Sequence, residues 1–144
     1  MLKLAALLLT AALPAGCQTA NSIPTKSNQV SVTGLAASAI AGDMASRFAE
    51  YVSASPTRTL KINKDTSEYA GALEAALKGW GYLVVTDRKT AEDPKPMELA
   101  WSIDNSDGQV LAQLATSSVT LARAYIPTTS GATPASPLSI MRRN

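Results

Sequence analysis

At 144 residues, the chain has room for one domain with flanking segments. Its 13 lysine and arginine residues against 11 acidic ones give a net charge of +2, so no strong basic field favours a nucleic acid as a direct partner. A single cysteine and the absence of histidine exclude an internal disulfide, the usual zinc sites and the commonest general base.

The N-terminus has the pattern of a signal peptide. Lys3 precedes an apolar run over residues 4–13, which is too short for the ~20 residues that a membrane-spanning helix needs. Two small residues then precede Cys17. The pattern resembles a bacterial lipoprotein signal, with residues 1–16 as the signal peptide, and this resemblance implies acylation of Cys17. The alternative is an ordinary cleaved signal that leaves a free thiol at Cys17.

Acylation would turn Cys17 into a membrane anchor, because each buried CH₂ group contributes about 0.8 kcal/mol. Gln18 follows the cysteine, whereas lipoproteins of this class that stay in the inner membrane commonly have Asp there. The resemblance therefore implies the outer membrane, with the protein facing the periplasm. Residues 17–32 are predicted to be the lipidated N-terminus and a flexible polar linker.

A helix, a strand, a second helix and a second strand are predicted next. Apolar residues recur at helical spacing over residues 33–53. Residues 58–63 alternate as a half-buried strand. A helix with its N-cap between Asp65 and Ser67 then runs to about Lys78. Residues 82–86 are predicted to form a strand that is too apolar for an exposed edge. This order predicts a βαβ unit with parallel strands and a right-handed crossover.

The second half predicts antiparallel strands. Residues 97–104 alternate with period two, and residues 105–108 end in the Asp-Gly pair of a hairpin turn. Return strands follow over 109–115 and 118–126, the latter with Val119, Leu121, Arg123 and Tyr125 on one face. The fold class is therefore α+β over residues 33–126, with two helices on one face of a small mixed sheet of about five strands. The Pro/Ser/Thr-rich tail, residues 127–144, is expected to be disordered or extended.

No catalytic or phosphate-binding motif occurs in the chain. Asp65 and Glu68 suit a helix cap, Asp104 and Asp107 a hairpin turn, and Asp87, Glu92 and Asp93 a solvated loop. Trp80 and Trp101 could stack on a sugar ring, but both are predicted on inner faces of their elements. No catalytic residue, metal or cofactor is therefore expected.

Four features occur in the order found in one known family: Cys17, the helix around Met44 and Phe48, the passage 73–87, and residues 121–125. In these features the chain resembles the TrbH family of conjugal transfer lipoproteins. The resemblance implies a structural role in the outer-membrane core of a type IV secretion system during mating-pair formation. Cys17 alone is carried over as a functional residue. A lipoprotein with a two-helix α+β domain is also similar to ring-forming secretion domains, although fold analogy does not establish function.

The sequence hypothesis is thus a non-enzymatic outer-membrane lipoprotein of a conjugative type IV secretion system. Its expected partners are membrane lipid, through acylated Cys17, and other core subunits in a ring-shaped hetero-oligomer. The edge of the last strand before Pro127 is the expected site of strand addition by a partner. One alternative is a periplasmic peptidoglycan- or glycan-binding module that uses Trp80 or Trp101. A third hypothesis is a small hydrolase that uses paired carboxylates.

Overall fold

A computed structural model of the chain describes residue 32 and residues 34–86 and 95–144. The described part contains two helices and two sheets, one of three and one of five strands, so the predicted α+β class is confirmed. In chain order the elements are α1 (Gly34–Tyr51), β1 (Thr59–Lys61), α2 (Glu68–Gly79), β2 (Leu83–Val85), β3 (Met97–Glu98), β4 (Ala100–Ser106), β5 (Gln109–Ala115), β6 (Val119–Thr128), β7 (Gly131–Pro134) and β8 (Ser139–Arg142).

The βαβ unit is present as predicted. Strands β1 and β2 are parallel, with Leu60 opposite Val84, and α2 connects them. Ser67 caps α2, and its side chain accepts a hydrogen bond from the backbone N–H of Ala70 at 3.2 Å. The expectation that the second strand avoids an edge is wrong, because β2 is the outer strand of its sheet and Leu83 is half exposed.

One continuous extended segment joins the two sheets. Its first part, β3, pairs in parallel with β1, and the N–H of Leu99 donates to the carbonyl of Lys61 at 2.9 Å. Its second part, β4, pairs in antiparallel fashion with β5. The predicted single mixed sheet is therefore divided into two sheets that share this segment. The tight turn to β5 has Asp107 and Gly108 at positive φ, as the Asp-Gly pair predicted.

The C-terminal residues form paired strands, so of the two expectations for the tail the extended one is confirmed and the disordered, flexible one is wrong. β6 continues through Pro127 to Thr128, past the predicted end of the domain. β7 and β8 both pair with β6, and the N–H of Ala135 also donates to the carbonyl of Ala124 at 2.8 Å. The composition of the tail did not predict these strands for two reasons. An open strand edge offers backbone hydrogen-bond partners to an extended segment whatever its side chains are, and prolines are tolerated at sheet edges.

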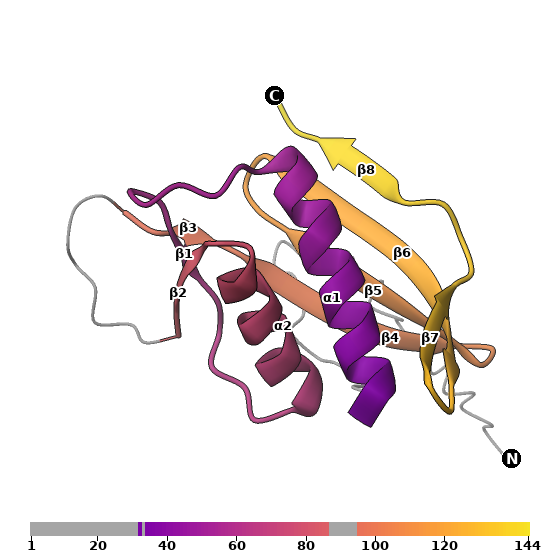
Figure 1. The fold of residues 1–144 in the computed structure, drawn as a ribbon. Coiled ribbons are helices and arrows are strands. Elements are labelled where there is room, and N and C mark those ends of the chain that lie inside the picture. The colour runs from indigo at the N-terminus through magenta and orange to yellow at the C-terminus, as the bar shows by residue number, and fades with distance from the viewer. Residues whose placement is uncertain (1–31, 33, 87–94) are drawn as a thin grey trace, which may run out of the picture.

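The same pairing overturns a second expectation. Figure 1 shows β8 lying beside β6 at the C-terminal end of the chain, and β7 pairs with the other part of β6. The edge of β6 that was expected to receive a partner strand is therefore occupied by the chain's own C-terminal strands.

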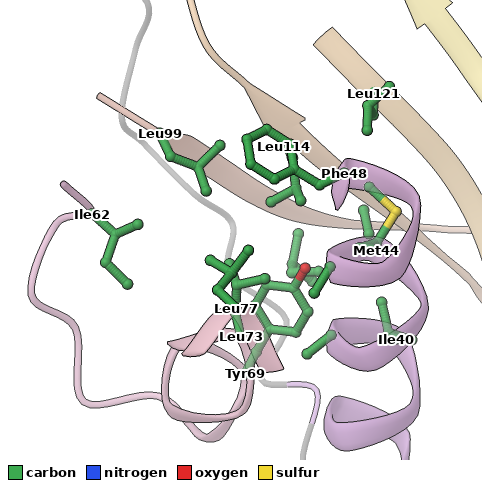
Figure 2. Close-up of a cluster of buried hydrophobic side chains, with 14 of the residues drawn as sticks. Ile40, Met44, Phe48, Ile62, Tyr69, Leu73, Leu77, Leu99, Leu114 and Leu121 are labelled. Atoms are coloured by element: carbon green, nitrogen blue, oxygen red, sulfur yellow. The ribbon is translucent and has the colours of Figure 1, made fainter. Parts of the chain in front are cut away.

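Both helices lie on one face of the strands (Figure 1). The buried side of α1 packs against inward residues of β5 and β6, and α2 packs beside α1. Figure 2 shows Met44 and Phe48 of α1, Leu73 of α2 and Leu114 of β5 in this cluster. All four side chains have no exposed surface. Burial of a leucine or phenylalanine side chain contributes roughly 1.5–3 kcal/mol, so this cluster holds the two layers together.

Candidate functional site

The predicted lipidation residue, Cys17, lies outside the described residues, as do the signal peptide (1–16) and the linker up to residue 31. Val32, the first residue that the structure describes, is buried and belongs to the core cluster. Gly34 then begins α1, and its N–H donates to the carboxylate of Glu68 at the start of α2. The end of the proposed linker is thus fixed to the core beside the first turns of both helices.

The two tryptophans do not form a common surface. Trp101 is half-buried on β4, where its ring packs against the ring of Tyr69 with centroids 5.2 Å apart. Trp80 is the C-cap residue of α2, and its side chain is 52% exposed. Residues 69 and 80 are separated by about 16 Å along the helix, at 1.5 Å per residue. A single sugar ring cannot contact both tryptophans in this arrangement.

The inward placement predicted for Trp80 is therefore wrong. The prediction extended the helical period from Leu73 and Leu77 to the next turn. The helix ends at Gly79, close to the predicted end near Lys78, and Gly81 takes a positive φ of 92°. The chain leaves the helix before Trp80 can face the core, as a glycine-assisted helix end allows.

A polar cluster that the sequence did not reveal lies between α1 and β6. Asp43 accepts hydrogen bonds from Arg123 Nη1 at 2.9 Å and from the Tyr125 hydroxyl at 2.7 Å. Arg47 approaches the other carboxylate oxygen at 3.6 Å. Arg123 also donates from Nε to the carbonyl of Ser136 at 3.0 Å. The Asp43 cluster, defined by these residues, connects the first helix, strand β6 and the segment between β7 and β8.

The contacts of the Asp43 cluster have a structural role, because they hold α1 against β6. Burial, the hydrogen bond to Asp43 and the charge of that carboxylate all raise the pKa of Tyr125 far above its usual value. Tyr125 therefore stays protonated and donates to Asp43 throughout the physiological range. One signal in the sequence could have predicted this cluster: Arg123 interrupts an otherwise apolar inward face, and a partly buried arginine needs an anionic partner.

Several other described carboxylates have local structural contacts. Asp65 accepts a hydrogen bond from the Ser67 N–H at 2.7 Å, in the turn before α2. Glu74 and Lys78 pair on the surface of α2 at 2.8 Å, and Arg47 pairs with Glu50 at 2.7 Å. Within the described ranges, no three acidic or cysteine side chains are grouped as metal ligands. Among the described residues, these contacts join neighbouring elements of the fold.

Neither helix of the described chain combines the length and apolar content needed to cross a membrane.

Comparison with known proteins gives a consistent family result. The model of the family "Conjugal transfer protein TrbH" matches residues 18–144. The chain is 59% identical to "Probable conjugal transfer protein TrbH" of Sinorhizobium fredii (strain NBRC 101917 / NGR234) over 148 residues, which covers 100% of both chains. No solved structure matches the chain.

Proposed function

Because the chain belongs to the TrbH family of conjugal transfer proteins, we propose that it is a structural lipoprotein of a conjugative type IV secretion system. It is anchored in the outer membrane through acylated Cys17, faces the periplasm and packs against other subunits of the outer-membrane core. The observation that carries this proposal is the family match, which spans residues 18–144 and so covers the whole chain after Cys17.

The sequence around Cys17 supports the anchor. The apolar run over residues 4–13 and the small residues before Cys17 fit removal of a lipoprotein signal. More than one acyl chain is needed for stable membrane attachment, and lipoproteins of this type carry a diacylated thiol. Gln18 in place of an aspartate directs such a protein to the outer membrane.

The arrangement of the domain supports a structural role. The buried Val32 fixes the end of the linker at the start of α1, so the linker defines how far the domain stands from the membrane. Most of the described carboxylates serve helix caps, surface ion pairs and the Asp43 cluster. The domain therefore offers packing surfaces, with which it joins neighbouring core subunits in a ring-shaped assembly.

Substitution of Cys17 tests the anchor. In donor cells, a Cys17→Ser chain is expected to lose acyl labelling and sedimentation with the outer membrane, and plasmid transfer is expected to fall by at least about tenfold. Thr19→Ser, two residues away, is the matched control and leaves both properties unchanged. A Gln18→Asp chain keeps its acyl label but is expected to fractionate with the inner membrane, which separates acylation from sorting.

The opposite result would overturn the proposal. A Cys17→Ser chain that still fractionates with the outer membrane and supports normal transfer has no need of a lipid anchor. Normal fractionation of the Gln18→Asp chain would contradict the sorting step alone.

A further inference from the structure

One face of the five-stranded sheet β4–β8 is not covered by the helices. Both helices lie on the opposite side of these strands (Figure 1). Alternate residues of β4, β5 and β6 point away from the helices, and we call this surface the open face. On β5 the inward residues Val110, Ala112 and Leu114 are buried, whereas Leu111 and Gln113 between them belong to the open face.

The open face has almost no charge. Among the outward positions of β4–β8, all of them within the described residues, Asp104 is the one ionisable side chain. When one face of a sheet meets water, the outward residues of each strand are usually polar or charged, and they alternate with apolar residues that point to the inner face. Loss of charge is instead typical of the centre of a protein interface. This composition indicates that the open face is covered by protein.

Small residues surround Gln113 at the centre of the open face, Leu111 lies two positions along the same strand, and Ile126 and Met141 lie nearer the margins. Strand pairing places Ala122 of β6 opposite Gln113 of β5, and Ala124 opposite Leu111. Leu111, Ile126 and Met141 are 40%, 47% and 60% exposed. Alanines permit close approach of a second sheet, at a separation of about 10 Å.

The area is sufficient for a stable interface. Four strand positions side by side at about 4.8 Å, each seven to ten residues long at about 3.4 Å per residue, give roughly 500–600 Å² of flat surface. Relief from the side chains increases this value. A standard interface buries about 800 Å² on each partner, so the flat area of the open face supplies most of one interface.

We propose that the open face binds the same face of a second copy of this chain across a two-fold axis. In such an isologous contact, residues on the axis meet their own copies. A charged side chain there would face a like charge, whereas the amide of Gln113 both donates and accepts and so can pair with itself. The lack of charge at the centre of the open face is therefore the composition that self-pairing requires.

The spacing along β5 also suits a second copy. Suppose that the two-fold axis crosses β5 at Gln113 and β6 at Ala122. The residue two positions before Gln113 in one copy then lies opposite the residue two positions after Gln113 in the other copy. Leu111 of one copy then lies over Ala115 of the other, so that a large apolar side chain meets a small one. Such sheets pack with their strands within about 30° of one another. This inference goes beyond the proposed function, because it concerns neither the anchor nor a different subunit.

Cross-linking of full-length protein tests the dimer. The chain has one native cysteine, Cys17. A Cys17→Ser/Gln113→Cys chain, expressed without other transfer proteins, therefore carries one thiol, next to the proposed axis. A short bis-maleimide is expected to convert most of it to a species of twice the chain mass. The matched control, Cys17→Ser/Ala75→Cys, places the thiol on the exposed surface of α2 and is expected to stay monomeric.

A charge at the axis should break the contact. Ala122→Glu, added to the Gln113→Cys chain, is expected to lower the cross-linked fraction by at least about tenfold, because like charges held opposite one another cost several kcal/mol. Ala75→Glu in the same background leaves the fraction unchanged, and circular dichroism of both chains reports whether each is folded. Because Cys17 is absent throughout, failure of the anchor proposal does not alter the outcome.

Two results would overturn the dimer. Equal cross-linking through positions 113 and 75 would mean that contact between copies is random. A folded Ala122→Glu chain that cross-links as strongly as its parent would place the interface elsewhere.

Discussion

The helix-covered side of this protein and its open sheet face differ in where charge is placed. On the helical side, apolar residues are buried beneath α1 and α2, and the outer helix surfaces carry ion pairs such as Arg47 with Glu50 and Glu74 with Lys78. On the open face, the strands present small uncharged residues and Asp104 alone is ionisable among the outward positions of β4–β8. The first surface is suited to water and the second to protein, which suggests that the domain is built to be covered on one side.

The same strands contribute to both environments. Leu114 and Leu111 are three residues apart on β5, yet Leu114 has no exposed surface and Leu111 is 40% exposed. Because successive side chains of a strand point to opposite faces, one leucine stabilises the fold and the other is available for contact. Substitutions that separate these two roles are the direct way to test the comparison.

The largest effect is expected from truncation of Leu114. Leu114→Ala should lower the free energy of unfolding by about 2–5 kcal/mol, because it removes buried methyl groups and leaves a cavity beneath α1. The matched substitution Leu111→Ala should cost less than about 1 kcal/mol in the monomeric, dilute chain. Urea denaturation followed by circular dichroism measures both. Equal losses would contradict the assignment of the two faces.

A smaller loss is expected when the Asp43 cluster is broken. Asp43→Ala leaves Arg123 and the Tyr125 hydroxyl without their acceptor, in a site where the Arg123 and Asp43 side chains are 18% and 26% exposed. A fully buried pair costs about 3–5 kcal/mol to break, so partial exposure reduces the expected loss to about 2–3 kcal/mol. Urea denaturation provides the measurement.

Two further variants control for charge and for the hydrogen bond. Glu50→Ala removes an exposed partner from the same helix and should change stability by no more than about 0.5 kcal/mol. Asp43→Asn keeps an acceptor oxygen and should fall between wild type and Asp43→Ala. If Glu50→Ala were as costly as Asp43→Ala, the Asp43 cluster between α1 and β6 would have no special role.

The smallest effect concerns alkaline pH. Burial raises the pKa of Tyr69 well above the ordinary value of about 10. Above pH 10 the unfolded chain therefore loses a proton that the folded chain retains. Because stability then falls as pH rises, Tyr69 accounts for a loss of up to about 1.4 kcal/mol per pH unit. Tyr69→Phe should have a correspondingly shallower decline between pH 10 and 11.

At neutral pH, Tyr69→Phe should be nearly neutral, because the Tyr69 hydroxyl is buried and has no hydrogen-bond partner among the described residues. Tyr125→Phe is the contrasting control, since it loses the bond to Asp43 and should destabilise the chain at pH 7. Denaturation curves at pH 7, 10 and 11 distinguish the two. A Tyr69→Phe chain with the wild-type decline above pH 10 would contradict the assignment to Tyr69.

Sequence reasoning predicted the elements whose signals are local. The period of the apolar residues predicted both helices, and alternation predicted the antiparallel strands β4 to β6. The Asp107–Gly108 turn followed from the need for positive φ at both positions. The predictions that were wrong concern which side chains are exposed and which strands lie at the edge of a sheet. Trp80 turns outward because α2 ends at Gly79, and β2 became an outer strand although its residues are apolar.

By itself, the sequence determined the α+β class, the parallel βαβ unit, the hairpin and the family, because these depend on periodicity, turn chemistry and residue identity along the chain. Tertiary structure alone decided that Asp43 meets Arg123 and Tyr125, about eighty positions away, and that a proline-rich tail completes the sheet. It also decided which face of the sheet the two helices leave uncovered. The physical reason is that ion pairing, edge pairing and layer packing depend on distances in space, which local residue patterns do not contain.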